Sequence, residues 1–178
     1  MKKGIFAPVI AIVLAALILL GLSVGLKGVA AANAQAEHLK IMQTLLPGST
    51  EFVVEPYSGD DTVIRSVHKG ETGFVIETVT AGYAGDIKML VAVSNEGEVV
   101  GLVVREMSET YSLGLNALND TDFLAQFLNT QGDAEIGDGV DAISGATVTS
   151  RAIARCVNSA AAYVTGADID SSATSWGG

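Results

Sequence analysis

Hydroxyl side chains gather where a glycine-containing loop leads into the last apolar segment of the chain. Ser144, Thr147, Thr149 and Ser150 lie within seven residues, with Gly145 among them. A helix that starts here would present unpaired backbone N–H groups, and its dipole would favour an anion at this end. The pattern therefore indicates a place where a phosphate group on Thr147 would be stabilised.

Two arginines, Arg151 and Arg155, follow one turn apart and add positive charge. A simpler interpretation needs no ligand, because Thr149 or Ser150 could cap the helix by accepting a hydrogen bond from a first-turn N–H group. The two interpretations are compatible, since different residues can serve each role. A threonine hydroxyl is a poor nucleophile and no histidine is near in sequence, so attachment of a group to Thr147 would need a separate enzyme.

Residue types for other chemistries are scarce. The chain has one cysteine, Cys156, which excludes an internal disulfide and a thiolate-bound metal cluster. The two histidines, His38 and His68, are far apart in sequence and leave little material for a metal site or a Ser-His-Asp triad. We therefore predict no catalytic residue and no metal ligand.

Charge is distributed unevenly along the 178 residues, whose formal net charge is −10. From residue 41 onward there are 19 acidic and 6 basic residues, a balance of −13. Nucleic-acid binding requires a basic surface, so nucleic acid is excluded as a partner.

Apolar residues are concentrated at the amino terminus, where residues 4–26 contain no charged side chain. About 20 apolar residues in a helix cross the hydrocarbon layer of a bilayer, so residues 1–28 are predicted to form a membrane anchor. A cleavable signal peptide is the alternative, because the Ala-Asn-Ala sequence at residues 32–34 resembles a cleavage site. Lys2 and Lys3 place the amino terminus in the cytoplasm, and the rest of the chain outside it.

Strand and helix patterns follow, which predicts an α+β fold with a mostly antiparallel sheet and flanking helices. A connecting helix over residues 29–47 precedes a folded domain at 48–166 and a flexible tail at 167–178. The expected elements are strands at 51–55, 62–67, 73–80, 87–94 and 98–106, a tight turn at 95–97, helices at 120–129 and 150–164, and loops at 108–119 and 131–139.

Two details of the helices can also be predicted. Asp120, or the threonine after it, is a candidate cap for the helix at 120–129. In the last helix, Ile153, Val157 and Ala161 recur at four-residue spacing with Cys156 beside them. Cys156 is therefore expected to be a small core residue rather than a redox group.

The motifs resemble one family of flavoproteins. The run Asp-Ala-Ile-Ser-Gly-Ala-Thr at 141–147 resembles the site at which a flavin transferase attaches FMN to a threonine, Asp-x-x-Ser/Thr-Gly-Ala-Thr. Residues 73–114 resemble the FMN-binding domain of the G subunit of the Rnf electron-transport complex, and 82–88 match its Gly-Tyr-x-Gly-x-Ile pattern. A Leu-Pro-Gly sequence at 46–48 also recurs in that family. The likeness covers most of residues 1–165.

The resemblance implies FMN joined to Thr147 by a phosphoester bond, with FAD as the donor used by the transferase. Within the motif and the loop that lies against the flavin, it implies these further cofactor-binding residues: Asp141, Ser144, Gly145, Ala146, Thr149, Glu109, Thr110, Leu113 and Gly114. That loop often reads Glu-Thr-Pro-Gly-Leu-Gly in the family, whereas Tyr111 and Ser112 replace Pro-Gly here. Tyr111 could stack on the ring or cover apolar surface, so the flavin contacts of this loop stay open.

The resemblance also implies a function. The chain would be the membrane-anchored electron-transfer subunit of an ion-translocating ferredoxin:NAD oxidoreductase, an electron carrier rather than a complete catalyst. Its partners would be the other subunits of the Rnf-type complex, the flavin transferase during maturation, and membrane lipid. It would cross the cell (inner) membrane once, with the FMN domain on the periplasmic or extracellular side.

Three other functions compete with this one. The C subunit of the sodium-pumping NADH:quinone reductase is similar in plan but usually longer. A cofactor-free exported structural domain would fit the strands and the acidic surface, but it would have no reason to carry the motif at 141–147. A hydrolase that uses Ser144 would lack a Gly-x-Ser-x-Gly motif and a histidine near in sequence.

Overall fold

A computed structural model describes residues 32–107 and 120–167 of the chain. The chain divides into two compact units, Met1–Lys40 and Ile41–Gly178. In the first unit, residues 32–40 are helical and largely exposed. The expected anchor at 1–28, the loop at 108–119 and nearly all of the expected tail lie outside the described residues. Within the described ranges, no helix combines the length and the apolar character needed to cross a bilayer.

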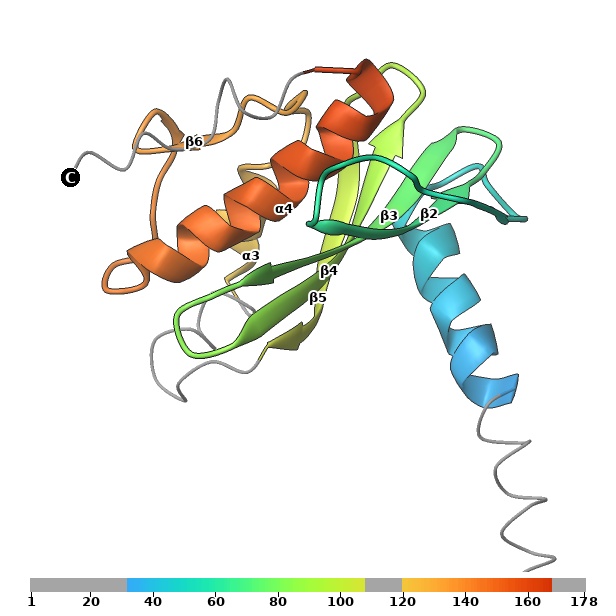
Figure 1. Cartoon of the computed structure of the whole chain (residues 1–178), viewed down its shortest axis with the longest axis horizontal. Coiled ribbons are helices and arrows are strands. Elements are labelled where there is room, and N and C mark those ends of the chain that lie inside the picture. Colours follow the sequence, from blue (N-terminus) through green and yellow to red (C-terminus); the bar gives the residue numbers. More distant parts are fainter. Residues whose placement is uncertain (1–31, 108–119, 168–178) are drawn as a thin grey trace, which may run out of the picture. The chain divides into compact units, whose positions relative to one another are not determined.

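The second unit is built on a five-stranded antiparallel sheet whose neighbours in space are also neighbours in sequence (Figure 1). Its strands are β1 (Val53–Glu55), β2 (Ile64–Lys69), β3 (Gly73–Ala81), β4 (Asp86–Ser94) and β5 (Val99–Met107). Antiparallel neighbours need only short connections, and Gly97 adopts φ of +89° in the turn between β4 and β5. The predicted α+β fold with an antiparallel sheet is confirmed.

Alternate residues of the central strands face opposite sides of the sheet, as the geometry of a strand requires. In β4, Met89 and Val91 belong to the larger core, whereas Leu90 and Ala92 belong to a smaller core on the other face. The smaller core is completed by side chains from residues 41–46. Because both faces are covered, residues 89–93 of β4 form an unbroken apolar run.

Helix α4 (Thr147–Thr165) lies along the larger core (Figure 1). Ile153 and Val157 are completely buried on its inner side. The helix ends at Gly166, which has φ of +69°, a left-handed conformation that glycine adopts without strain. The sequence predicted a start at Ser150, but the helix begins three residues earlier.

Helix α3 (Thr121–Ala125) starts as predicted, because Oδ1 of Asp120 accepts a hydrogen bond from the Phe123 N–H group at 2.9 Å. The prediction that this helix continues to residue 129 is wrong. Asn129 has φ of +65°, and its N–H group donates to the Val99 carbonyl at 2.8 Å. This contact with the start of β5 overrides local helix preference. The rings of Phe123 and Phe127 meet edge to face, with centroids 5.2 Å apart.

Three other elements differ from the prediction. Strand β1 begins at Val53, two residues after the expected start at 51. Strand β2 is displaced by two residues from the expected range of 62–67, and its pairing with β3 shifts register near Ile64. The expected loop at 131–139 contains β6 (Glu135–Ile136), which pairs in parallel with β7 (Gly139–Val140). The Asn158 side chain of α4 holds this segment by accepting from the Ala134 N–H group at 3.1 Å and donating to the Ala134 carbonyl at 2.9 Å.

Candidate functional site: the loop that enters α4

The loop before α4 is a tight turn with its own hydrogen bonds. The Ala146 N–H group donates to the Ile143 carbonyl at 2.9 Å, and Gly145 between them has φ of +79°. A residue with a Cβ atom would be strained in that conformation. The Asp141 N–H group donates to Oε1 of Gln126 at 2.8 Å, which ties the loop to the segment after α3.

Ser150 connects the first turn of α4 to this loop. Its side chain is completely buried, and its hydroxyl donates to the Ala146 carbonyl at 3.0 Å and accepts from the Ile143 N–H group at 3.2 Å. The alternative in which Thr149 or Ser150 caps the helix is therefore wrong. The N-cap residue is Ala146, which makes no side-chain capping bond.

The first turn of α4 consequently keeps its free N–H groups. The first N–H groups of a helix have no partner within the helix, and the dipole makes this end positive. No acidic residue lies in the first turn to offset that potential. Thr147 is the first residue of α4 and is exposed, so its hydroxyl lies at the positive end of the helix.

The structure gathers one group of the predicted cofactor-binding residues in this loop and leaves others elsewhere. The group in the loop consists of Asp141, Ser144, Gly145, Ala146 and Thr147, all exposed except Ala146. Thr149 is only 2% exposed, which leaves its side chain little surface for a ligand. Glu109, Thr110, Leu113 and Gly114 lie outside the described residues, as do Tyr111 and Ser112.

Two arginines extend the positive potential along α4. Arg151 and Arg155 are exposed, and they follow Thr147 at spacings of four and eight residues. Positions four apart lie on the same side of a helix, so the three residues share its outer face. In a domain with few cations, this face is suited to a negatively charged group.

Cys156 is a core residue, as predicted. Burial raises the pKa of its thiol from 9.0 to about 11, and the Thr78 hydroxyl and the Arg155 charge lower it only in part. The thiol is therefore protonated at neutral pH and is a poor nucleophile or metal ligand. Among the residues that the structure describes, no three His, Cys, Asp or Glu side chains come close enough to hold a metal ion.

Sequence reasoning missed a polar cluster on the other face of the sheet. The Ser66 hydroxyl donates to Oε2 of Glu77 at 3.0 Å and lies 3.1 Å from Nε2 of His68. A hydroxyl has one proton, so His68 is the donor when Ser66 donates to Glu77. In a Ser-His-Asp triad the histidine is the middle member, whereas here the serine is, so the cluster does not have the geometry of a hydrolytic triad.

The roles of two residues that shape the site were not predicted, since Ser150 was expected only as a possible cap and Gln126 was not considered. The one signal for Ser150 was its position four residues after Ala146, from which a serine can bond back to a helix carbonyl. Gln126 gave no signal, because it lies 15 residues from its partner Asp141.

Comparisons with known proteins place these features in a family. Residues 82–162 match the family described as the FMN-binding domain, a stretch that includes the loop at 141–147. A relative from Methanosarcina acetivorans, named as the G subunit of an ion-translocating oxidoreductase complex, is 33% identical over 147 residues, which are 73% of this chain and 77% of the relative. The chain belongs to the family of G subunits of ion-translocating oxidoreductase complexes. The identification made from the sequence motifs is thereby confirmed.

Other relatives in this family match over a shorter stretch. One from Clostridium ljungdahlii, named as the G subunit of a proton-translocating ferredoxin:NAD(+) oxidoreductase complex, is 35% identical over 99 residues, 52% of this chain and 53% of the relative. One from Vibrio cholerae is 34% identical over 104 residues, 52% of this chain and 50% of the relative. The chain thus spans about half the length of these two bacterial proteins. The predicted FMN-binding domain is confirmed, whereas attachment to Thr147 stays a prediction.

Proposed function

We propose that this chain is the membrane-anchored electron-transfer subunit of an ion-translocating ferredoxin:NAD oxidoreductase complex, with FMN attached covalently to Thr147. Membership of the G-subunit family and the FMN-binding domain support this function. FMN supplies the electron-transfer chemistry, and the chain supplies its position and surroundings. The partners are the other subunits of the complex.

The position of Thr147 is the observation that supports it as the attachment site. Its hydroxyl is exposed at the start of a helix whose N-cap residue makes no side-chain bond. A phosphate ester on this oxygen would accept hydrogen bonds from the first-turn N–H groups and would be stabilised by the helix dipole. Exposure also leaves the hydroxyl open to a modifying enzyme, whereas Thr149 is buried.

The attachment requires a second protein. In the described part of the chain, no side chain hydrogen-bonds to the Thr147 hydroxyl, so nothing there is placed to remove its proton. In the proposed reaction the Thr147 oxygen would form a bond to the FMN phosphorus of FAD, and the pyrophosphate bond would break with AMP as the leaving group. The hydroxyl proton passes to a base on the flavin transferase.

Co-expression with a flavin transferase tests the site. The full chain should keep flavin fluorescence on a denaturing gel, and its intact mass should increase by FMN less one water. Thr147→Ala should abolish both signals. Thr149→Val is the matched control, because it removes a hydroxyl two residues away and keeps the shape of a buried side chain. Covalent FMN on the Thr147→Ala protein would show that attachment occurs elsewhere.

The proposed domain organisation follows the sequence. Residues 1–28 form the anchor with its amino terminus in the cytoplasm, 29–47 the connecting helix, 48–166 the FMN-binding domain on the outer side, and 167–178 the tail. Alkaline phosphatase should be active when it is fused to the carboxyl terminus, and green fluorescent protein should be dark when it is fused at the same place. The opposite pattern would place the domain in the cytoplasm. The intact mass of the mature chain distinguishes a retained anchor from a cleaved signal peptide.

A further inference from the structure

An open cavity of about 270 Å³ lies at the surface, where β2, the end of β3 and the start of β4 approach α4. Its lining is mainly polar and comes from four elements or their flanking residues. The residues that matter for its chemistry are Thr62, Arg65, Thr80, Asp86 and Arg155, with Val63 as an apolar contribution. This composition differs from an apolar core defect, which would stay dry and bind only apolar molecules.

Two arginines from different elements line this cavity, Arg65 from β2 and Arg155 from α4. Residues 41–178 contain only six cationic side chains, so two of them at one cavity is a marked concentration. Neither is paired with a carboxylate among the residues that the structure describes, unlike Lys69, whose Nζ lies 3.4 Å from Oε1 of Glu55. Arginine presents several N–H donors in a fork that matches the oxygens of a phosphate group.

Asp86 narrows the class of ligand. With Arg65 and Arg155 it leaves the cavity lining with a net charge of +1. Its carboxylate would repel a simple anion, but it could accept a hydrogen bond from a hydroxyl group on the same ligand. The Thr62 and Thr80 hydroxyls can donate or accept. The lining therefore suits a ligand that combines a phosphate group with hydroxyl groups.

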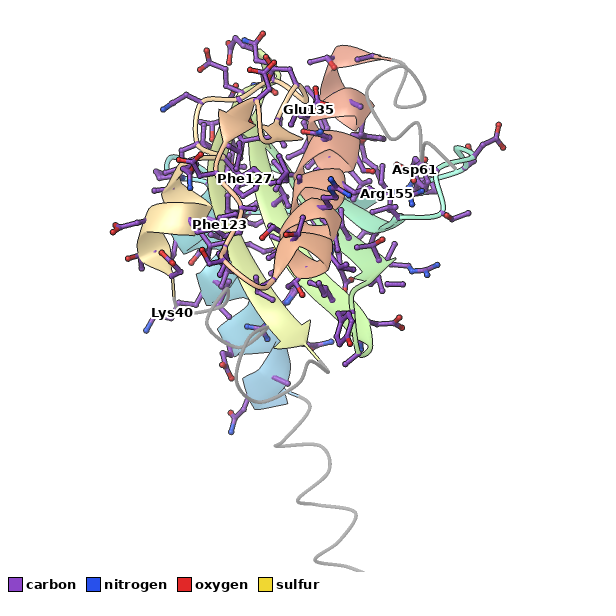
Figure 2. All side chains as sticks on the ribbon, turned by 90° about the vertical axis from the view of Figure 1, so that its left-hand side faces the viewer. Lys40, Asp61, Phe123, Phe127, Glu135 and Arg155 are labelled. Carbon is purple, nitrogen blue, oxygen red and sulfur yellow. The ribbon has the colours of Figure 1, made fainter. Side chains whose placement is uncertain are left out.

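A further acceptor lies beside the cavity. Asp61 precedes the lining residue Thr62, and its Oδ1 accepts from the Val63 N–H group at 2.9 Å. Its Oδ2 is buried without a hydrogen-bond partner among the described residues, although buried polar atoms usually have one. Figure 2 shows Asp61 and Arg155 on the same side of α4. Asp61 does not line the cavity, so its contribution is to hold the backbone of Val63 beside the lining residue Thr62.

The cavity is distinct from the position of Thr147. Thr147 does not line it, and Arg155 follows Thr147 by eight residues, about 12 Å along the helix axis. A ligand in the cavity would therefore occupy a site of its own, whether or not Thr147 is modified.

We propose that this cavity binds the phosphate ester of a polyol, such as glycerol phosphate. Arg65 and Arg155 hold the phosphate, and Asp86 accepts a hydrogen bond from a hydroxyl. Such a group can come from a free polyol phosphate or from the glycerol phosphate headgroup of a phospholipid such as phosphatidylglycerol.

The full chain with Thr147→Ala, solubilised in neutral detergent, is the protein for the test, because it cannot carry FMN on that oxygen. Calorimetric titrations use glycerol 3-phosphate, inorganic phosphate and dihexanoyl phosphatidylglycerol. We expect glycerol 3-phosphate to bind more tightly than inorganic phosphate. Arg65→Gln and Arg155→Gln should each weaken binding about tenfold or more. Asp86→Asn should reduce the preference for glycerol 3-phosphate, since a charged acceptor is lost.

Arg105→Gln is the matched control, because it removes the same charge from an exposed position on β5 outside the cavity. It should bind like the parent. Tighter binding of phosphatidylglycerol than of glycerol 3-phosphate would support the lipid headgroup as the source, and the reverse order would support a free polyol phosphate. Absence of saturable binding by all three ligands, or unchanged affinity in both arginine variants, would overturn the proposal.

Folding of each variant is checked by its thermal transition. Both arginines are exposed, so their replacement leaves the core intact, and either variant alone suffices for the test. The measurement uses protein without FMN on Thr147. A negative binding result would therefore not bear on the attachment proposal, and disproof of attachment at Thr147 would not bear on the cavity.

Discussion

The buried hydroxyl of Ser150 accepts a hydrogen bond from the Ile143 N–H group at 3.2 Å while it donates to the Ala146 carbonyl at 3.0 Å. One side chain thus fastens two points of the loop that presents Thr147. Loss of this hydroxyl would leave the Ile143 N–H group without its partner, whereas the Ala146 carbonyl would keep the Ser150 backbone N–H group at 2.9 Å. The geometry of the exposed threonine therefore depends on a residue inside the protein.

Replacement of Ser150 by alanine should destabilise the domain and loosen this loop. The Ile143 N–H group would lose its partner, and an unsatisfied buried donor costs about 1–3 kcal/mol. Urea unfolding measures the loss, and the yield of covalent FMN on co-expression should fall with it. Ser144→Ala removes an exposed hydroxyl from the same loop and should change the free energy of unfolding by no more than about 0.5 kcal/mol. Equal stability of the two variants would refute the fastening role.

Gly101 should tolerate no side chain. A Cβ atom there would lie 2.5 Å from the Leu45 carbonyl oxygen, a backbone atom that cannot rotate away. Gly101→Ala should therefore reduce the free energy of unfolding by about 1–3 kcal/mol, the usual range for overpacking. Thermal unfolding checks this, with Val100→Ala at the neighbouring, partly exposed position as the control. A variant with the stability of the parent would mean that residues 41–46 shift without cost.

Asn158 should be required for order in the segment before β6. Asn158→Ala removes both bonds to the backbone of Ala134 and should cost about 1–3 kcal/mol. Hydrogen–deuterium exchange at the Ala134 amide should become faster than in the parent. Gln131→Ala, an exposed change in the same segment, should leave that exchange rate unchanged. Unaltered protection in the Asn158 variant would show that β6 and β7 are held by other contacts.

The buried thiol of Cys156 should make the domain less stable at high pH. Its pKa rises from 9.0 to about 11 on burial, so between these values the unfolded chain loses the proton while the folded chain keeps it. The contribution of the protonated thiol to stability is complete below pH 9 and is lost as the pH rises towards 11. Between pH 8 and pH 10.5, the free energy of unfolding in urea should fall by about 1–2 kcal/mol more for the parent than for Cys156→Ala.

Tyr163 also has a raised pKa, because of burial and its hydrogen bond to Glu55. Tyr163 is present in both the parent and Cys156→Ala, so its effect on the free energy of unfolding cancels in the comparison. Identical pH profiles for the parent and the Cys156 variant would mean that the thiol ionises within the folded domain.

The central strands could be predicted from sequence because their signals are local. Strands β3 and β4 match their predicted ranges to within one residue, since β-branched and apolar residues fill them. The turn between β4 and β5 could be located from Asn95 and Gly97, which tolerate positive φ. Each of these signals lies within a few residues of the structure that it specifies.

The helix boundaries near the site could not be predicted in the same way. The start of α4 at Thr147 has no capping side chain, and sequence rules therefore favoured the later Thr149 or Ser150. The end of α3 depends on bonds between residues 129–130 and Val99, about 30 positions away in sequence. Of the site itself, the motif at 141–147 was visible in the sequence, but the bonds that shape it come from Gln126 and from inside α4.

Each strand of the sheet can pair with its neighbour as soon as the next strand is synthesised, whereas α4, which covers the larger core, follows all the strands in sequence. A chain that has been synthesised only as far as residue 152 lacks Ile153 and Val157, and the larger core then has no helix over it. Thr147 gains its fixed position only when that final segment docks. Attachment of FMN to Thr147, as proposed above, would therefore follow the synthesis and docking of α4, and a chain that stops before α4 would offer the flavin transferase no acceptor.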